Sequence, residues 1–404
     1  MMRTPALRIV FLIVLMDLAG FGLILPILPL YVNALGGSPL FIGALLSSYS
    51  LAQFAFNPVW GRLSDRLGRR PIILMSLTGS MLSYLAYGGA EFVSGDARIV
   101  LAVLLVSRLL AGAMGANIAT AQAVVADVTT VGGRAAGMGM IGAAIGLGFV
   151  LGPAMGALFT LPPLSQRYGL GLPGFVAAGI ALANLLWALR SLPETLDPEN
   201  RRRAASLRLL GVWQGLARRH AILLLVGAMF LLTLAFSQFE ASFSLLAGLQ
   251  FTFGPSRIGL VFAYIALVMV FMQGVATRLL VSRLGERRVA LLGAGLMSVA
   301  MAGVAATDRV PLLLLWLGVL GVGFGATQPT LLGMLSQRAR GEQQGVTLGL
   351  GQAMGSLARI AGPILGMGLF GGLSMRAPFW AAALMMAGVL LATLSLRAER
   401  ERPA

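Results

Sequence analysis

Long hydrophobic runs recur along the whole chain, separated by short charged clusters and by turns rich in Gly and Pro. Each run has about 20 residues, which is the length that a helix needs to cross the hydrocarbon core of a bilayer. A helix also satisfies its own backbone N–H and C=O groups, which lipid cannot do. Only 11% of the 404 residues are charged, against about 25% in an ordinary soluble domain. The sequence therefore predicts an all-α polytopic membrane protein.

The runs predict twelve transmembrane helices. Their expected bounds are 8–32, 40–61, 71–92, 98–126, 134–160, 171–191, 220–248, 256–281, 288–307, 310–337, 343–371 and 376–397. The first run follows two arginines, as a signal peptide would. It contains Asp17 and two prolines, however, and has no clear cleavage site of small residues. We therefore expect it to be retained as the first span.

The distribution of arginine predicts the orientation of these helices. All 30 basic residues are Arg, and the formal net charge is +16. If the termini are cytoplasmic, 23 of the 30 arginines fall on the cytoplasmic side, five on the opposite side and two, Arg108 and Arg359, within spans. Such an excess in cytoplasmic loops is the signal that orients membrane helices. We therefore expect cytoplasmic termini and a lipid bilayer, rather than a nucleic acid, as the partner of this charge.

The twelve helices are predicted to form two halves of six. The longest polar segment, residues 192–219, contains two prolines and three consecutive arginines and falls near the middle of the chain. We interpret it as a cytoplasmic linker between an N-terminal half, residues 1–191, and a C-terminal half, residues 220–404. Two parallel six-helix halves are a known transporter plan, with the substrate site near the midplane between them.

The two halves also repeat each other in sequence. Arg-Leu-Gly-Arg-Arg at 66–70 recurs as Arg-Leu-Gly-Glu-Arg at 283–287, an offset of 217 residues. Gly-Pro-Ala-Met-Gly at 152–156 recurs as Gly-Pro-Ile-Leu-Gly at 362–366, an offset of 210 residues. Both offsets are close to half the length of the chain, which supports an internal duplication.

The segment between the second and third spans carries the most specific motif. Residues 61–71 are Gly-Arg-Leu-Ser-Asp-Arg-Leu-Gly-Arg-Arg-Pro. With the span count, the linker and the half repeat, this motif resembles the major facilitator superfamily over essentially the whole chain. The resemblance implies two pseudo-symmetric six-helix halves and a latch between them on the cytoplasmic side. The expected residues of this cytoplasmic gate are Gly61, Asp65, Arg66, Gly68, Arg69, Arg70 and Asp127.

The resemblance also implies how the gate is paired. Asp127, near the end of the fourth span, is expected to form an ion pair with Arg66 or Arg70. The second copy of the motif has Ser282 in place of Asp65, so the latch is expected to be one-sided. The alternative interpretation is a plain positive-inside loop, which requires neither Asp65 nor the glycines.

The fifth span contains Gly148, Gly152, Pro153 and Gly156 in a GxxxGPxxG pattern. In the family that the chain resembles, this pattern is associated with antiporters. Small residues four apart allow two helix backbones to approach closely, and a proline kinks a helix. The pattern therefore predicts an antiporter hinge, with plain helix packing as the alternative.

Three ionisable residues inside spans are the candidates for proton coupling: Asp17, Glu240 and Arg108. The first span resembles that of tetracycline/proton antiporters and their drug-efflux relatives, and the resemblance assigns Asp17. A carboxyl group in a membrane exchanges protons according to its surroundings. The alternative for either acid is a structural partner of a polar neighbour. Arg108 has the alternative of lying near the external end of its span, with its charge reaching the interface.

Polar and aromatic residues inside spans are candidates for binding a substrate. They are Gln53, Asn57, Asn117, Gln122, Phe236, Gln238, Phe239, Gln273, Gln328 and Gln352. Amides fix the orientation of a ligand and aromatic rings offer adaptable apolar surface. Hydrogen bonding between helices or contact with lipid is an equally good interpretation of any one of them.

Nothing in the chain predicts an enzyme, a cofactor or a metal site. There is no Cys, and HExxH, GxxxxGK[ST] and GxSxG motifs are all missing. We expect a monomeric, proton-coupled secondary transporter of a bacterial inner membrane that exports drug-like or amphiphilic small molecules by alternating access. The alternatives are the same fold transporting a sugar, a metabolite or a lipid, or a sensor that transports nothing.

Overall fold

The computed structural model describes residues 5–93, 95–115, 117–196, 220–338 and 344–396. Regular secondary structure in this part of the chain is helical, and twelve spans are long and apolar enough to cross a membrane. These spans are Ala6–Ala34, Pro39–Leu67, Arg69–Val93, Ala97–Val128, Ala136–Phe159, Leu172–Ser191, His220–Phe251, Pro255–Leu284, Glu286–Ala306, Val310–Arg338, Thr347–Gly372 and Ala377–Ser395. The predicted all-α fold with twelve spans is confirmed.

The expected spans differ most from the observed ones at the end of the second span. The hydrophobic run was expected to end at residue 61, and the helix continues to Leu67. Hydrophobicity marks only the part of a helix that lipid covers, whereas this helix ends where the backbone of Gly68 turns to a φ of +112°. An L-amino acid with a side chain is strained at such an angle, so glycine ends the helix.

The chain divides into two compact units. Unit 1 comprises Met1–Ala205 and Phe243–Ala266, and unit 2 comprises Ser206–Ser242 and Leu267–Ala404. Unit 1 therefore also takes in a segment that the sequence places in the C-terminal half. Most of the expected linker, residues 197–219, lies outside the described residues.

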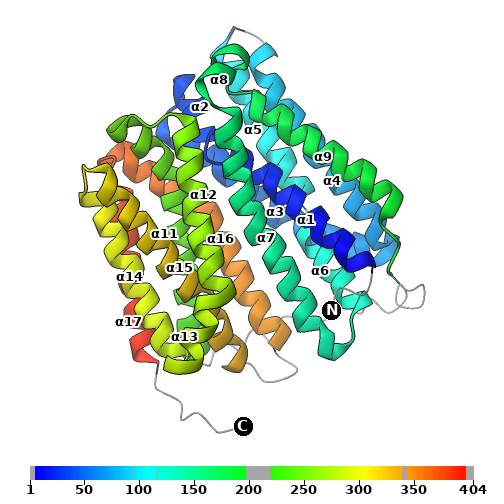
Figure 1. The fold of residues 1–404 in the computed structure, drawn as a ribbon, viewed down its shortest axis with the longest axis vertical. Helices are drawn as coiled ribbons and strands as arrows, with labels where there is room; N and C mark the ends of the chain where they lie inside the picture. Colours follow the sequence, from blue (N-terminus) through cyan, green and yellow to red (C-terminus); the bar gives the residue numbers. More distant parts are fainter. Residues whose placement is uncertain (1–4, 94, 116, 197–219, 339–343, 397–404) are drawn as a thin grey trace. The chain divides into compact units, whose positions relative to one another are not determined.

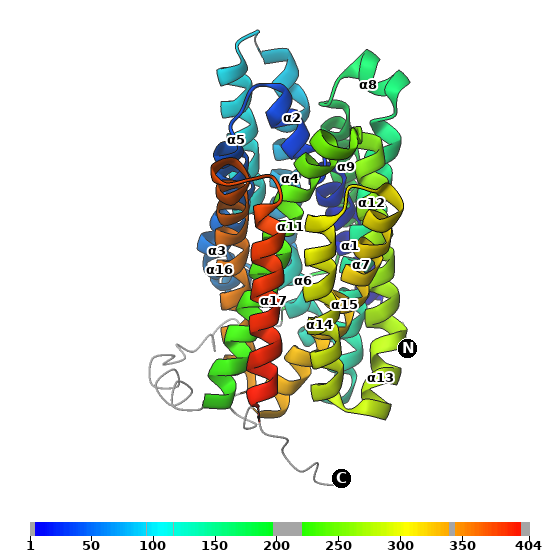
Figure 2. The same ribbon diagram turned by 90° about the vertical axis from the view of Figure 1, so that its left-hand side faces the viewer.

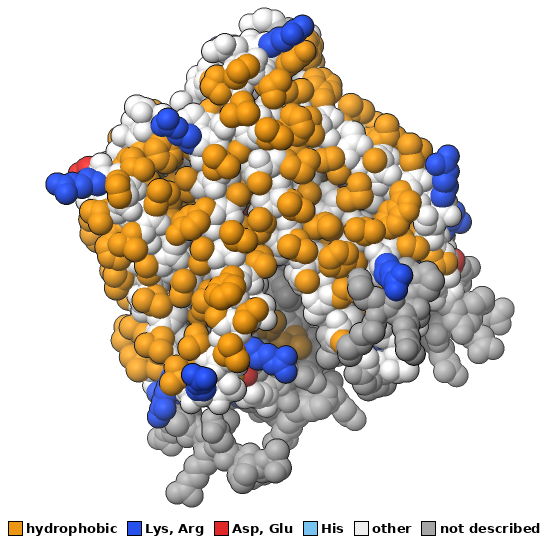
Figure 3. Space-filling model, in the orientation of Figure 1, with side chains coloured by type: hydrophobic (Ala, Val, Ile, Leu, Met, Phe, Trp, Pro, Cys, Tyr) orange, Lys and Arg blue, Asp and Glu red, His pale blue; other side chains and the backbone are white. Residues whose placement is uncertain are grey.

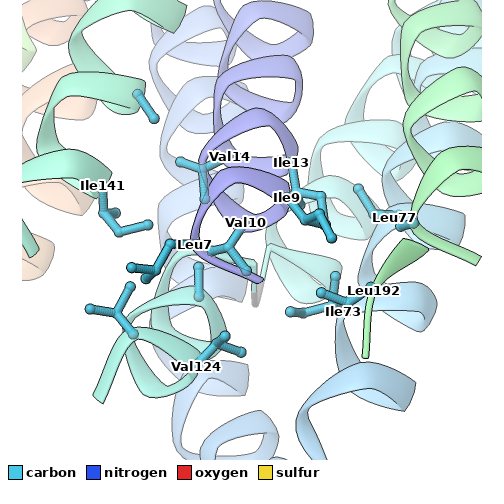
Figure 4. Packing of buried hydrophobic residues seen from close by; sticks show 14 of the residues in the cluster. Leu7, Ile9, Val10, Ile13, Val14, Ile73, Leu77, Val124, Ile141 and Leu192 are labelled. Atoms are coloured by element: carbon cyan, nitrogen blue, oxygen red, sulfur yellow. The ribbon is translucent and has the colours of Figure 1, made fainter. Parts of the chain in front are cut away.

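Unit 1 is built around its first helix. In its first segment, Met1–Ala205, the helices are α1 (Pro5–Ile24), α2 (Leu28–Ala34), α3 (Pro39–Leu67), α4 (Arg69–Val93), α5 (Ala97–Met114), α6 (Asn117–Val128), α7 (Val131–Phe159), α8 (Pro162–Tyr168) and α9 (Leu172–Ser191). α1 lies between α7 and α9, and α4 packs against α5 and α9 (Figure 1). Buried side chains of α1, among them Val10, Ile13 and Val14, pack against Ile73 and Ile141 (Figure 4).

The predicted hinge pattern lies where α7 packs against α1. A Cβ atom placed on Gly152 would lie 2.6 Å from the carbonyl oxygen of Ala19, and one on Gly156 would lie 2.6 Å from that of Leu23. The backbones are therefore too close for any side chain at these positions. This contact explains the small residues by helix packing, and the hinge stays a prediction.

The regular structure described in unit 2 is also helical. Its helices are most of α11 (His220–Phe251), the end of α12 (Pro255–Phe271), the π-helical turn η2 (Met272–Ala276), α13 (Thr277–Leu284), α14 (Glu286–Ala306), α15 (Val310–Arg338), α16 (Gln344–Gly372) and α17 (Ala377–Ser395). α14 packs against both α15 and α17, and Figure 2 shows α17 between α14 and α16. Side chains on the face shown in Figure 3 are mostly hydrophobic, with arginines near its edges.

Candidate functional site

A polar cluster inside unit 1 surrounds Asp17. This α1 residue lines a small cavity of about 20 Å³. The other polar side chains of the cavity are Tyr49 and Gln53 of α3 and Ser80 and Tyr84 of α4. A volume of about 15 Å³ or more with several polar partners is enough to hold one water molecule. The cluster therefore places a carboxyl group, hydroxyl groups and space for a single water together within the helices of unit 1.

Arg108 lies near the same cluster and is 2% exposed. Its guanidinium carbon is 5.6 Å from the ring centroid of Tyr87, which is a cation–π distance. Tyr84 connects the two candidates for proton coupling, because both Asp17 and Arg108 act electrostatically on its hydroxyl group. Within the described residues, Nε and Nη2 of Arg108 have no hydrogen-bond partner. One interpretation of the sequence had the charge of Arg108 reaching the membrane interface. The burial of this side chain speaks against that interpretation.

Glu240 is the corresponding acid in unit 2. It lies on α11, and the charge that acts on it is that of Arg359 on α16. Arg359 Nη2 also donates a hydrogen bond to Ser356 Oγ, at 3.3 Å. The sequence identified both charged residues without pairing them, because they are more than a hundred positions apart. Each unit therefore contains one membrane acid and one membrane arginine, which act on each other in unit 2 and on the shared Tyr84 in unit 1.

The expected substrate-binding residues divide into three groups. Gln53 lines the Asp17 cavity and donates to the carbonyl oxygen of Gly115 at 3.4 Å. Gln238 and Phe239 are fully buried, and Gln238 donates to the carbonyl oxygen of Pro378, so these two hold α11 against α17. The side chain of Asn117 lies outside the described part, and the other residues are half-buried or exposed: Asn57, Gln122, Phe236, Gln273, Gln328 and Gln352. Of the set, Gln53 is thus the residue that the structure brings together with Asp17.

Some members of the third group are joined to each other or to the aromatic core. Gln273 Nε2 donates to Gln328 Oε1 at 3.4 Å. The ring of Phe236 lies 4.3 Å from that of Phe324 and 6.0 Å from that of Phe239, measured between centroids. These contacts are within unit 2 and support the interpretation of helix packing for Phe236.

The expected gate residues form an ion-pair network at the start of α4. Arg69 Nη1 lies 2.5 Å from Asp65 Oδ1 and 2.8 Å from Ser64 Oγ, and Arg69 Nε lies 3.0 Å from Asp127 Oδ2. The partner of Asp127 is therefore Arg69, and the expectation of Arg66 or Arg70 was wrong. Arg69 is the first residue of α4, directly after the turn at Gly68, which directs its side chain toward α3 and α6.

The other two arginines of the motif are engaged elsewhere or exposed. Arg70 Nη2 donates to the carbonyl oxygen of Leu189 at 2.7 Å, which ties α4 to the end of α9. Arg66 is exposed in the last turn of α3, where a positive charge is favoured by the helix dipole. Gly61 has nothing within 4 Å of a Cβ position, so close packing does not explain its being a glycine.

Glu194 is a residue of this network that sequence reasoning missed. Its carboxylate accepts the backbone N–H groups of Arg69, at 2.9 Å, and of Arg70, at 3.2 Å, and so caps the start of α4. Burial opposes its ionisation, but the backbone N–H groups of Leu196, Arg69, Arg70 and Thr195 outweigh it and lower the pKa of Glu194 below its usual range. In the sequence, Glu194 is only an acid that follows the sixth span. Its capping role could not be predicted from that position, because Arg69, whose N–H it accepts, is 125 positions away.

Gly68 is required by the same carboxylate. A Cβ atom on Gly68 would lie 2.2 Å from Glu194 Oε2, in addition to the strain of its φ of +112°. The glycine thus serves two purposes: it turns the backbone and leaves room for the acid that caps α4.

Known proteins with related sequences were found over nearly the whole length of the chain. The chain matches the family described as Major Facilitator Superfamily over residues 10–305 and 244–404. It is 33% identical to the class G tetracycline resistance protein of Vibrio anguillarum, covering 98% of this chain and 97% of that one. It is 31% identical to multidrug resistance protein 2 of Bacillus subtilis (strain 168), covering 91% and 89%.

Two solved structures are similar to the fold. The human organic anion transporter MFSD10 (TETRAN) matches with a TM-score of 0.69 and 28% identity, over 96% of this chain and 99% of that one. A mutant of the nucleoside transporter NupG matches with a TM-score of 0.74 over the same shares, and at 14% identity it supports the fold alone.

Proposed function

The chain belongs to the major facilitator superfamily, and we propose that it is a proton-coupled exporter of drug-like or amphiphilic small molecules that works by alternating access. Membership makes the protein a secondary transporter with several membrane spans and not an enzyme. The relatives named for multidrug and tetracycline resistance support the class of cargo. The bacterial relatives support a bacterial inner membrane protein, and the excess of arginine in the expected cytoplasmic loops supports termini that both lie in the cytoplasm.

The observation that carries the proposal is the arrangement of Asp17, Tyr84 and Arg108 in unit 1. Asp17 and the buried Arg108 can carry opposite charges, and both act electrostatically on the hydroxyl group of Tyr84. A proton on Asp17 removes one of these two influences on Tyr84, and bulk water cannot compensate at Arg108, which is 2% exposed. Binding of a proton therefore changes the energy of the whole cluster, which is the requirement for coupling protons to a conformational change.

Glu240 and the exposed Arg359 provide a second acid and arginine, in unit 2. In the proposed cycle, a proton from outside binds to Asp17 or Glu240 in the outward-open state as the cargo leaves. The proton is released on the cytoplasmic side after the transporter has changed state. Because the proton and the cargo bind to the same conformational states with different affinities, each changes the affinity of the protein for the other.

Transport in proteoliposomes with an imposed pH gradient tests the proposal. We expect Asp17→Asn and Glu240→Gln, singly or together, to abolish gradient-driven movement of ethidium or tetracycline while leaving binding measurable. Asp308→Asn is a matched control, because this exposed acid pairs with Arg376 at the ends of helices. If efflux in the double variant equals that of the unchanged protein, the proton-coupling proposal is wrong.

Organic anions are a second candidate cargo. Two observations favour them: the similarity to a human organic anion transporter over 96% of the chain, and the unpartnered N–H groups of the buried Arg108 within the part of the chain that the structure describes. The same proteoliposomes, tested with a fluorescent organic anion, separate the two classes. Faster uptake of the anion than of ethidium assigns the anion, and the reverse result assigns the cationic drug. A sugar, a metabolite or a lipid belongs in the same panel.

A further inference from the structure

We propose that Glu286 and Arg338 form a switchable ion pair in unit 2, with their charges exchanged relative to Arg69 and Asp127 of unit 1. The pair would tie the start of α14 to the end of α15 in one transport state and release it in another. This inference rests on the proposed function only in requiring alternating access, and it adds two residues to which no role in the cycle has been given above.

The internal repeat places Glu286 where Arg69 stands in unit 1. An offset of 217 residues aligns Gly285 with Gly68 and Glu286 with Arg69. Both glycines have a positive φ, +80° and +112°, and a helix begins at the next residue in each case. The turn is therefore preserved between the units, while the charge that it presents has been inverted.

Arg338 completes the comparison. It is the last residue of α15, the tenth span, as Asp127 lies in the last turn of α6, at the end of the fourth span. The positive charge that acts on Glu286 is that of Arg338. An acid at the start of one helix thus faces a base at the end of another, as in unit 1, with each sign reversed.

The pair is open in this structure. Glu286 Oε2 and Arg338 Nε are both buried without a hydrogen-bond partner among the described residues, and no ion pair joins these two side chains there. Arg338 Nη1 donates to the carbonyl oxygen of Met334 at 3.3 Å. Both side chains are half-buried, and a buried carboxylate oxygen and a buried guanidinium nitrogen without partners are costly, so closing the pair is favourable. The corresponding groups in unit 1 lie 3.0 Å apart.

Space for the movement exists beside Glu286. A cavity of about 210 Å³ adjoins this residue and is lined by Gln273, Thr277, Arg278, Val281, Pro329 and Thr330. At the equivalent turn of unit 1, Arg69 fills the space with its contacts to Ser64 and Asp65. Val281 aligns with Ser64 by the offset of 217, and Glu is shorter than Arg, so the substitutions leave the cavity.

The backbone next to the cavity also departs from regular helix. The π-helical turn η2, Met272–Ala276, directly precedes α13, and its Gln273 is one of the lining residues. Such turns are frequently found at functional sites. The cavity and the π-helical turn lie on the same elements as the open ion pair, and a movement of α13 and α14 relative to α15 would affect all three.

The absence of cysteine from the chain makes the proposal directly testable. In the variant Gln273→Cys, the new thiol lies at an exposed position beside the cavity and reports whether the cavity is open to a membrane-impermeant maleimide. We expect Glu286→Gln and Arg338→Gln each to raise the labelling rate about fivefold or more, because neither can close the pair. The charge exchange Glu286→Arg with Arg338→Glu is expected to restore the slow rate. Arg287→Gln is a matched control, because Arg287 donates to α17 at Thr393 and Leu394 instead.

The labelling experiment requires no substrate and no pH gradient, so it is independent of the drug and proton proposal. Equal rates in the unchanged protein and both single variants would overturn the ion pair. A charge-exchanged variant that labels as fast as the single variants would also overturn it, provided that it elutes as a monodisperse protein. If that variant does not fold, Arg338→Lys replaces it, since a lysine retains the charge and is expected to keep labelling within about twofold of the unchanged rate.

Discussion

Arg69 Nε lies 3.0 Å from Asp127 Oδ2, which joins the first turn of α4 to the last turn of α6. Arg69 also contacts Asp65, so the guanidinium group of a residue that is 8% exposed holds two carboxylates. A surface ion pair contributes little, but removing one member of a buried group leaves the others without a partner. The contact is therefore expected to stabilise unit 1 as well as to serve the proposed gate.

Substitution of Arg69 tests this stabilising role. We expect Arg69→Gln to lower the free energy of unfolding by about 2 kcal/mol, since Asp127 and Asp65 both lose their cation and Asp65 is partly solvated. Arg66→Gln is the matched control, because Arg66 is exposed in the last turn of α3. Thermal unfolding in detergent measures both. Equal midpoints for the two variants would show that the network does not stabilise the protein.

Gly68 and Gly61 belong to the same motif, but the backbone angle and the close packing require a glycine only at position 68. We expect Gly68→Ala to destabilise unit 1 by more than about 1 kcal/mol, because of its positive φ and the clash with Glu194. Gly61→Ala is expected to be neutral or to stabilise α3 by up to about 1 kcal/mol, since Gly61 lies within the helix with open space around it. Denaturant unfolding of the pair, with transport measured in parallel, checks both signs. A loss of transport in Gly61→Ala without a loss of stability would indicate a role in gating.

The pKa of Glu194 predicts a pH dependence. Its folded value lies below the usual 4.5, so its contribution to stability is present above that pH and is lost as the pH falls through the lower folded value. We expect Glu194→Gln to be less stable than the unchanged protein near pH 7, and expect the difference to shrink as the pH falls below 4.5. Unfolding midpoints of the two proteins across this range provide the measurement. A difference that stays constant with pH would mean that charge plays no part in the cap.

Local signals were sufficient for the fold but not for the contacts of the site. Span lengths follow from hydrophobic runs, and each expected end lies within six residues of the observed one. The partner of Asp127 depends instead on where α4 begins and on how the turn at Gly68 directs the chain. A hydrophobic run predicts neither of these. For the same reason, Glu194 and the influence of Arg359 on Glu240 emerged only from the structure, since each relationship joins segments that are distant in sequence.

The contact between α1 and α7 separates the two interpretations of the GxxxGPxxG pattern. Gly152→Ala brings a methyl group within 2.6 Å of the carbonyl oxygen of Ala19, and we expect it to cost about 1–3 kcal/mol of stability. Gly142→Ala is the matched control on the same helix, with nothing within 4 Å. Pro153→Ala leaves the small residues in place and restores a backbone N–H group, so a hinge predicts lower transport at unchanged stability, whereas packing alone predicts unchanged transport. Transport assays and thermal unfolding of the three variants therefore decide whether α7 bends during the cycle or only packs.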